Sequence, residues 1–357
     1  MMSPSSPEEL AEIVRSTPRL QAVGSGTKPR LYAPEVPRVS ITALTGIVEY
    51  DPSEFTFTAR AGTPLREITA ALAEKGQYLP FDPMLVEAGA TLGGTIAAGL
   101  SGPGRFRFGG IRDFILGVRF VDGMGRLLRM GGKVVKNAAG FDLPKFFVGS
   151  LGRFGLLAEV TFKVFPRPPA SRTLKLTLDS VEDAARVLTD AANTRWEPEA
   201  LDLLPDGQSV LLRLAAPAAA LEAISAEILA RWLGVVLSEE EARTTWQSIG
   251  EFRWAYGDGA LLKAPITPAD VSRLHRSFDA KSGGRLHVSA GGNVSFLSFP
   301  AEKNAAEIDT TLRESSLSAL TLRGHTPARA GRRSHFEIDA AVKSALDPDS
   351  RFPSLEA

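Results

Sequence analysis

Two glycine-rich stretches hold the residues whose types and spacing could do chemistry. The first, VGSGTK, runs from Val23 to Lys28 directly after an apolar stretch that is typical of a β-strand. Successive backbone N–H groups in such a turn can bind an anion, and the side chains of Ser25, Thr27 and Lys28 add hydrogen-bond donors. A phosphate site and an ordinary tight turn both fit this pattern, so both interpretations stay open.

Neither of two common nucleotide fingerprints is present in this first stretch. It has a G-x-G pattern but lacks the third glycine of a Rossmann loop, and Pro29, Pro34 and Pro37 exclude a long helix directly after it. The G-x-x-x-x-G-K-[ST] spacing of a Walker A loop is also absent. If the stretch binds a phosphate, it does so outside these two motifs.

The second stretch, GATLGGTIAAGLSGPGRFRFGG, places eight glycines in the 22 residues from Gly89 to Gly110. Glycine weakens an ordered element by about 0.5–1 kcal/mol relative to alanine, so this density needs a physical reason. A flexible linker is disfavoured, because Leu92, Ile96 and Leu100 recur at the spacing of one buried helical face. We favour a backbone that lies against a ligand; a tightly packed core turn is the alternative.

Other catalytic signatures are sparse. The chain has no cysteine, which excludes disulfides, thiolate nucleophiles and Cys-ligated zinc or iron–sulfur clusters. No G-x-S-x-G elbow occurs, and no histidines show the spacing of a helical zinc site. We expect no metal site and a structural role for the four histidines His275, His287, His325 and His335. We expect solvated surface from the basic cluster Arg323, Arg329, Arg332 and Arg333.

Composition sets the broad class. The 357 residues suffice for two or three domains, and the equal totals of 41 basic and 41 acidic residues argue against broad electrostatic binding to nucleic acid or anionic lipid. The N-terminus lacks a basic segment followed by an apolar one, and no apolar run reaches about 18 residues. We therefore expect a cytoplasmic protein without a signal peptide or a membrane span.

The elements that would position the glycine stretches alternate between strands and helices. We expect a helix over residues 7–16 and strands over 20–23, 38–44, 55–62, within 115–130 around a glycine turn, and over 156–165. Thr63 followed by Pro64 predicts a helix that Thr63 caps and that ends at Gly76. The PRPP sequence at 166–169 predicts a domain boundary.

The second half predicts an α+β domain. Strands are expected over 172–178, 201–205, 209–215, 260–266 and 318–324, with a β-hairpin over 285–299. Helices are expected from Ser180, Ser238 and Thr267, each with a capping residue, and over 217–233 and 301–315. This order of elements favours an antiparallel sheet covered by helices on one face.

The two glycine stretches and their continuation resemble a known family. The segment AVGSGTK, and the run from TLGG at Thr91 to VFPRP at Pro168, are similar to the FAD-binding domain of the vanillyl-alcohol oxidase/PCMH superfamily. Within it, KNAAGFDL and GSLGRFGLLAE in this order resemble the FAD-binding E subunits of bacterial glycolate oxidases. The resemblance implies a PCMH-type FAD-binding domain of two α+β subdomains over 1–170, an α+β cap domain over 171–330, and a tail over 331–357 that packs back toward the FAD domain.

The resemblance also assigns roles toward FAD. It implies that the first loop wraps the pyrophosphate, that the second lies against the ribityl chain and the isoalloxazine, that Asp113 braces the second loop, and that Gly155 to Leu157 run past the adenosine end. The implied cofactor-binding residues are Val23, Gly24, Ser25, Gly26, Thr27, Lys28, Thr91, Leu92, Gly93, Gly94, Ala97, Ala98, Ser101, Gly102, Asp113, Gly155 and Leu157.

Departures from the family pattern refine this expectation. Covalent members link the flavin through a histidine or cysteine near these loops, whereas this chain has no cysteine and no histidine before His275. FAD is therefore expected to bind noncovalently. Relatives often carry tyrosine where Phe141 stands and a polar residue where Leu151 stands, so one ligand hydrogen bond is expected to be missing.

The resemblance leads to three functional hypotheses. The first is a flavin-binding subunit of a glycolate-oxidising complex, inactive alone, with a second flavin subunit and an iron–sulfur subunit as partners. It would be cytoplasmic, reach the inner membrane face only through its partners, and bind no nucleic acid. The second is an assembly subunit with a vestigial flavin site, and the third a stand-alone flavin oxidase of another small hydroxy acid or alcohol. The resemblance assigns no catalytic residue.

Overall fold

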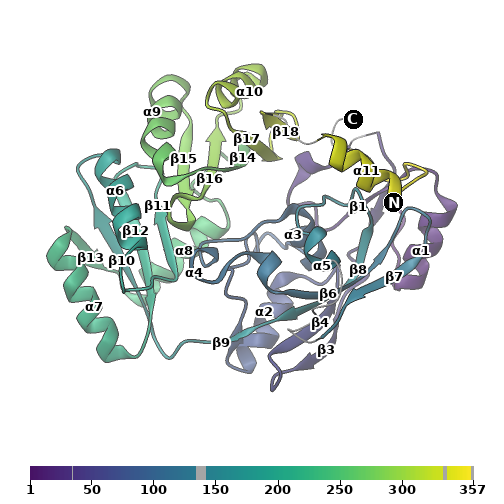
Figure 1. The fold of residues 1–357 in the computed structure, drawn as a ribbon, viewed down its shortest axis with the longest axis horizontal. Helices are drawn as coiled ribbons and strands as arrows, with labels where there is room; N and C mark the ends of the chain where they lie inside the picture. Colours follow the sequence, from purple (N-terminus) through teal and green to yellow (C-terminus); the bar gives the residue numbers. More distant parts are fainter. Residues whose placement is uncertain (34, 134–141, 333–335, 355–357) are drawn as a thin grey trace.

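The computed structural model describes the chain except residues 34, 134–141, 333–335 and 355–357. Phe141 and most of the KNAAGFDL motif therefore lie outside the described residues, as do Arg333 and His335. The described chain forms two lobes (Figure 1). Residues before the PRPP segment and the C-terminal helix form one lobe, which we call the FAD-binding lobe after the resemblance above, and the rest forms the other, which we call the cap lobe or cap.

A five-stranded antiparallel sheet lies at the centre of the FAD-binding lobe. Its strand order is β3 (Ile47–Asp51), β4 (Thr56–Arg60), β8 (Leu156–Lys163), β6 (Ile115–Val121) and β7 (Leu127–Gly131). The side chains of β8 alternate between two cores. Leu157 and Phe162 pack with helices α2 (Leu65–Glu74) and α3 (Leu92–Ala98), whereas Leu156 and Ala158 pack with helix α1 (Pro7–Ser16).

Short elements complete this lobe and place the first glycine stretch. Strand β1 (Gln21–Val23) pairs in parallel with β2 (Arg38–Ser40), and the VGSGTK loop and the 3-10 turn η1 (Pro29–Leu31) connect them. The second glycine stretch contains α3 and the one-turn helix α4 (Arg105–Phe108), followed by η2 (Ile111–Asp113). The remaining short elements are β5 (Gln77–Tyr78), its partner β9 (Phe165–Pro166) and helix α5 (Leu143–Phe146).

The cap lobe is built on a nine-stranded antiparallel sheet. Its strand order is β13 (Gly234–Val236), β10 (Ser171–Thr177), β12 (Ser209–Ala215), β11 (Ala200–Leu203), β15 (Arg285–Ser289), β16 (Val294–Phe299), β14 (Ala260–Pro265), β17 (Ser318–Arg323) and β18 (Arg329–Gly331). The turns η3 (Pro268–Asp270) and η4 (Ala290–Gly292) connect its elements.

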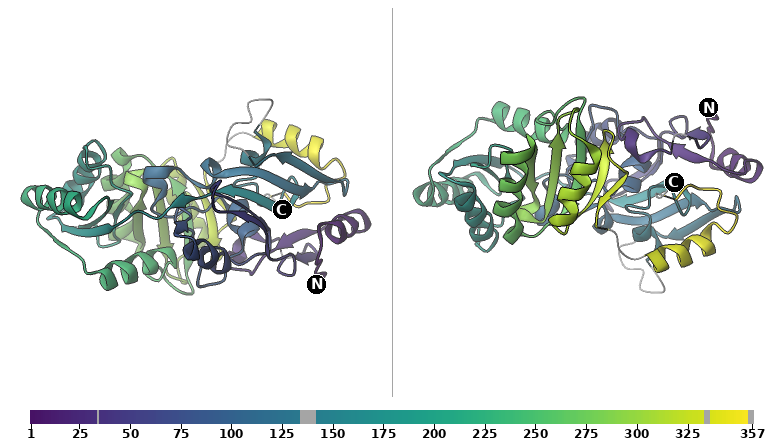
Figure 2. Two further views of the ribbon diagram at one scale, coloured as in Figure 1. Left: turned by 90° about the horizontal axis from the view of Figure 1, so that it is seen from below. Right: turned by 90° about the horizontal axis from the view of Figure 1, so that it is seen from above.

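Helices cover one face of this sheet, and the FAD-binding lobe covers the other (Figures 1 and 2). Ala260 and Leu262 of β14 pack in the core under the outer helices, whereas Leu261 between them packs in the core of the FAD-binding lobe. The outer helices are α6 (Val181–Ala192), α7 (Ala218–Arg231), α9 (Val271–Ser282) and α10 (Ala305–Glu314). Helix α8 (Glu239–Gly250) lies on the inner side, where the Gly250 carbonyl accepts a hydrogen bond from the Leu85 backbone.

The C-terminal residues lie against the FAD-binding lobe. Helix α11 (Phe336–Leu346) runs beside strands β6 and β7 in all views (Figure 2), and the Leu346 carbonyl accepts a hydrogen bond of 2.9 Å from the Gly123 backbone. Further on, Phe352 is buried in the core beneath α1, and the Arg351 carbonyl accepts from the Leu20 backbone at 2.9 Å. The tail is therefore linked to the strand that leads into the VGSGTK loop.

The structure confirms most of the expected elements and corrects one cap. Ser180 and Ser238 cap α6 and α8 as predicted. The prediction for Thr63 was wrong, because Pro64 is the cap residue of α2 and the Thr63 hydroxyl instead donates to the Arg60 carbonyl at 2.7 Å. Over the residues that the structure describes, helices of the length and apolar character needed to cross a bilayer are absent.

Candidate functional site

A hollow in the FAD-binding lobe brings both glycine stretches together. It is lined by the loop after β1, by the start and inner face of α3, and by a third segment that precedes β8. Most of the residues expected at the cofactor line it: Gly24, Ser25, Gly26, Thr27, Lys28, Thr91, Gly93, Gly94, Ala97, Ala98, Gly155 and Leu157.

The glycines of this hollow serve two different physical needs. A Cβ at Gly24 would lie 2.4 Å from Thr91 Oγ1, and one at Gly93 would lie 2.8 Å from Ala61 Cβ, so these two glycines let backbones pack closely. A Cβ at Gly94 would approach only Thr91 Oγ1, at 3.0 Å, and one at Gly26 would meet nothing within 4 Å. Gly94 and Gly26 therefore keep the hollow open, whereas Gly24 and Gly93 assemble its walls.

Sequence reasoning missed part of the third segment. Ser150, Leu151 and Gly152 line the hollow; of these, only Leu151 was expected near the ligand, as a position where relatives often carry a polar residue. Leu151 has a φ of 56°, which is uncommon for a residue with a side chain, and its N–H donates to the Ala97 carbonyl at 3.0 Å. This hydrogen bond ties the segment to α3, which a sequence motif cannot reveal.

Lys28 gives the hollow a buried cation. Its side chain is only 4% exposed, and its Nζ donates to Thr27 Oγ1 at 2.9 Å. Burial lowers the pKa of Lys28 to about 8, because the charged form loses hydration. A diphosphate placed against this ammonium and the adjoining backbone N–H groups would restore the lost solvation.

The lowered pKa of Lys28 predicts opposite pH effects on FAD affinity and on the stability of the ligand-free fold. Between about 8 and 10.5, the unfolded chain binds more protons than the fold, so the free energy of unfolding should rise with pH in this window. FAD binding needs the charged form, so its Kd should increase by up to about tenfold per pH unit above 8. FAD titrations at pH 6 to 10 test this prediction. Lys28→Met should bind FAD weakly, with a Kd that does not change with pH. A Kd that rises with pH in Lys28→Met as steeply as in the wild type would contradict it.

A second hollow opens where the two lobes meet. It shares Ala98 and Leu151 with the first hollow, so the two are contiguous. The FAD-binding lobe contributes Ser101 and Arg105, and the cap contributes Lys263 of β14, whose Nζ donates to the Gly99 carbonyl at 2.5 Å. Sequence reasoning missed Lys263, since nothing in the pattern of β14 distinguishes it from an ordinary surface lysine.

The second hollow is cationic. Burial, with a smaller contribution from Arg105, lowers the pKa of Lys263 to about 8, and burial also lowers the pKa of Arg105. Arg329 of β18 lines the same hollow. The charged forms of Lys263 and Arg105 are disfavoured by burial, so both favour a small anion there, because an anion would stabilise these charged forms.

The other expected site residues lie beside the hollows or in the walls. Val23 and Leu92 are buried in the interior. Ser101 and Asp113 line the second hollow and hold its loop: Ser101 Oγ accepts from Ile111 N at 3.1 Å, and Asp113 Oδ2 from Gly110 N at 2.9 Å. Gly102 lies flat on a neighbouring loop and lines neither hollow.

Only part of the basic cluster near the C-terminus is the solvated surface that we expected: Arg332 is exposed, whereas Arg323 and Arg329 are half-buried. Arg323 donates from Nη2 to the Tyr256 carbonyl at 2.6 Å, and burial lowers its pKa. Arg329 lies 3.5 Å from Asp339 of α11 and lines the second hollow. Both arginines sit on strands at the lobe boundary, so their spacing in the sequence does not reflect a shared surface.

The three histidines that the structure describes, His275, His287 and His325, line neither hollow. His287 is fully buried in the cap, where its Nε2 lies 2.9 Å from Asp202 Oδ2. His325 is exposed and contacts the Lys303 carbonyl through Nε2 at 2.7 Å. Within the described part of the chain, clusters of three or more histidine, aspartate or glutamate side chains suited to a metal ion do not occur.

Comparisons with known proteins agree with this geometry. Residues 1–131 match a family model described as an FAD binding domain. The chain is 37% identical over 301 residues to the glycolate oxidase subunit GlcE of Escherichia coli strain K12, across 83% of this chain and 81% of that protein. It is also 31% identical over 161 residues to the glycolate oxidase subunit GlcD of Bacillus subtilis strain 168, across 45% of this chain and 34% of that one.

A solved structure supports the same fold. An alkyldihydroxyacetonephosphate synthase superposes with a TM-score of 0.74 over 98% of this chain and 75% of that one, and at 17% sequence identity this likeness concerns the fold alone. The comparisons confirm the predicted fold class, and the FAD binding domain match confirms FAD as the cofactor. The chain therefore belongs to the family of the glycolate oxidase subunit GlcE, FAD-dependent oxidoreductases of the vanillyl-alcohol oxidase/PCMH superfamily.

Proposed function

We propose that this chain is the FAD-binding subunit of a complex that oxidises glycolate or a related small 2-hydroxy acid. The observation that carries the proposal is the first hollow, which is lined both by bare backbone at Gly26 and Gly94 and by the buried Lys28. These features fit an extended dinucleotide with a diphosphate and a flat ring. Bound FAD supplies a two-electron acceptor for such an oxidation.

In this proposal the first hollow binds the cofactor and the second hollow binds the substrate. Lys28 and the backbone of the VGSGTK loop hold the diphosphate, while Gly94, Ala97 and Ala98 leave room for the rest of the cofactor. Lys263 and Arg105 attract the carboxylate of the hydroxy acid to the contiguous second hollow. This arrangement would bring an anionic substrate to the cofactor.

The cofactor is held without a covalent bond in this proposal. The usual anchors are a histidine or cysteine, and the chain has no cysteine and no histidine before His275. The protein purified with its flavin should therefore release all yellow colour when it is denatured and passed through a size filter. Flavin that stays with the polypeptide would contradict noncovalent binding, and a colourless chain that takes up no added FAD would favour the vestigial alternative.

A partner is proposed as the route by which electrons leave. The relatives GlcE and GlcD are named as subunits, and the present chain lacks the cysteines needed to ligate an iron–sulfur cluster of its own. We infer a hetero-oligomer with a second flavin subunit and an iron–sulfur subunit, the latter passing electrons onward. Peripheral attachment to the inner membrane face would then come through these partners.

The decisive experiment compares the chain alone with the complex. The tagged chain, isolated gently from its native host, should bring a second flavoprotein and an iron–sulfur protein with it, and this assembly should oxidise glycolate with an artificial dye. The FAD-loaded chain alone should show little turnover. Isolation as a monomer whose reduced flavin reacts rapidly with oxygen would replace the proposal with a stand-alone oxidase.

A further inference from the structure

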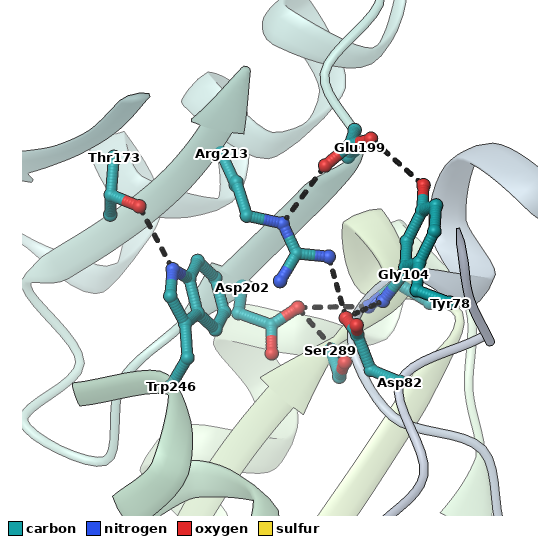
Figure 3. A network of polar contacts seen from close by, with 10 residues as sticks. Tyr78, Asp82, Gly104, Thr173, Glu199, Asp202, Arg213, Trp246 and Ser289 are labelled. Carbon is teal, nitrogen blue, oxygen red and sulfur yellow. Dashed lines mark hydrogen bonds and ion pairs between the residues drawn. The ribbon is translucent and has the colours of Figure 1, made fainter. Parts of the chain in front are cut away.

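A buried charged network joins the two lobes (Figure 3). Arg213 of β12 donates from Nη2 to Asp82 Oδ2 at 2.6 Å and from Nε to Glu199 Oε2 at 3.2 Å. Tyr78 donates to Glu199 Oε1 at 3.3 Å, and the Trp246 ring lies 5.2 Å from the guanidinium. Asp82 and Tyr78 belong to the FAD-binding lobe, whereas Arg213, Glu199 and Trp246 belong to the cap.

Asp82, which pairs with Arg213, also contacts the second glycine stretch. Its Oδ2 also accepts a hydrogen bond of 2.7 Å from Gly104 N, and its backbone carbonyl accepts one of 2.9 Å from Gly102 N. A Cβ at Gly102 would lie 2.4 Å from the Asp82 carbonyl, and one at Gly104 would lie 2.0 Å from the Pro80 carbonyl. The two glycines thus let this loop lie flush against residues 80–82.

The backbone of Asp82 is itself constrained. Its φ of 50° lies in the left-handed region, which non-glycine residues rarely adopt and which persists only when the surroundings impose it. Three hydrogen bonds to the side-chain and backbone oxygens of this residue supply that constraint. A residue whose strained backbone is held by several hydrogen bonds is suited to fix the position of the loop that it contacts.

The loop that Asp82 holds carries a residue of the second hollow. Gly104 is the cap residue of α4, and the next residue, Arg105, lines the hollow. The following residue, Phe106, packs against the cap, because a Cβ at Gly291 would lie 2.5 Å from its ring. A shift of Gly104 would therefore move Arg105 relative to Lys263 on the opposite lobe.

We propose that Arg213 is a positioning residue that, through Asp82 and the Gly104 amide, sets Arg105 in the second hollow for recognition of a small carboxylate. The inference rests on the proposed function for the identity of this anion. The guanidinium suits the task because Nε and Nη2 reach two separate carboxylates at once, which a lysine ammonium on a flexible stem cannot match. In this way a cap residue, Arg213, sets the position of Arg105, which belongs to the FAD-binding lobe.

The first measurement tests the positioning without any anion. In the FAD-loaded chain, Arg213→Met should speed hydrogen exchange of the Gly104 amide by about 10- to 100-fold, because the charged acceptor of this amide loses its own partner. Arg213→Lys should give an intermediate rate. If Arg213→Met fails to fold, the double variant Arg213→Met/Glu199→Gln removes one of the two stranded carboxylates and carries the same test.

The second measurement tests the consequence with oxalate, a small carboxylate that has no C–H hydride to give up. Oxalate binding, followed through the flavin absorption spectrum, should weaken by about tenfold or more in Arg213→Met, while the Kd for FAD stays within about twofold of wild type. Arg107→Gln is the matched control. It removes the exposed pair of Arg107 with Glu197, which also joins α4 to the cap, and should leave both measurements unchanged.

The outcomes separate the inference from the proposed function. Wild-type exchange of Gly104 in Arg213→Met overturns the positioning role, whatever the chain binds. Equal effects of Arg213→Met and Arg107→Gln overturn it as well, because any weakening of the lobe contact would then suffice. If wild-type protein binds no oxalate, the carboxylate part of the proposal fails, and the exchange data alone then decide whether Arg213 positions the loop.

Discussion

Gly94→Val is expected to abolish FAD binding and to leave the fold almost unchanged. A Cβ at this position would meet only Thr91 Oγ1, at 3.0 Å, and because Gly94 lines the first hollow we expect the added methyl groups to project into it. Valine is no worse than glycine within a helix, so the free energy of unfolding should change by less than about 1 kcal/mol. The valine side chain would occupy space that FAD needs, so the Kd for FAD should rise more than about 100-fold, which corresponds to about 2.7 kcal/mol of binding free energy.

The neighbouring glycine provides a contrast within the same turn of α3. A Cβ at Gly93 would lie 2.8 Å from Ala61 Cβ and 3.0 Å from the Ala61 carbonyl, which already accepts a hydrogen bond of 2.7 Å from Gly93 N. Gly93→Val should therefore destabilise the fold by about 2–3 kcal/mol through overpacking. Urea unfolding and FAD titration of both variants test the pair. Wild-type affinity in Gly94→Val would show that this face of α3 does not contact the cofactor.

This contrast marks what the glycine pattern could predict. The density of glycines between 89 and 110 and the apolar spacing of Leu92, Ile96 and Leu100 indicated a packed segment, and all three leucine and isoleucine side chains are buried. The sequence could not distinguish Gly93 from Gly94, because their roles depend on Ala61, which lies on a distant strand end. Close packing at Gly93 and an open face toward the hollow at Gly94 occur side by side.

The sequence could not predict which residues of the cap line the second hollow. Lys263 and Arg329 reach the second hollow only because the antiparallel order of the sheet puts β14, β17 and β18 at the lobe boundary. Sequence periodicity predicted β14 and β17 as strands but carries no information on which face meets the other lobe. The same limit explains Arg213, whose partners Asp82 and Glu199 come from two different lobes.

Local signals predicted element types better than their edges and partners. Ser180 and Ser238 predicted the starts of α6 and α8 correctly, because each hydroxyl accepts a hydrogen bond from the N–H three residues further on. Thr63 failed because a hydrogen bond to the Arg60 carbonyl competes with capping. Strand β3 (Ile47–Asp51) was not expected at all, since its exposed edge position leaves little apolar alternation to detect.

The tail illustrates a long-range contact with a functional consequence. Asp347 is buried, accepts hydrogen bonds of 2.9 Å from the backbones of Arg351 and Phe352, and pairs with Lys343. The turn that it stabilises aims the Arg351 guanidinium at the C-terminal end of α1, where it donates to the Val14 carbonyl at 3.0 Å. The Arg351 carbonyl in turn accepts from Leu20, at the entry to β1 and the VGSGTK loop.

Asp347→Ala should therefore destabilise the FAD-binding lobe by about 3–5 kcal/mol, because it removes the carboxylate that pairs with the half-buried Lys343 ammonium, which keeps the Arg153 and Phe352 carbonyls, and leaves two backbone donors unpaired. FAD affinity should fall with it, since the strand that leads into the VGSGTK loop loses its anchor. Asp349→Ala is the control: its carboxylate is 62% exposed and lies 3.5 Å from Arg351, so stability should change by less than about 0.5 kcal/mol. The four tryptophans all lie in the cap, so far-UV circular dichroism and FAD fluorescence must report unfolding of this lobe. Equal urea midpoints for the two variants would show that the tail does not support the cofactor site.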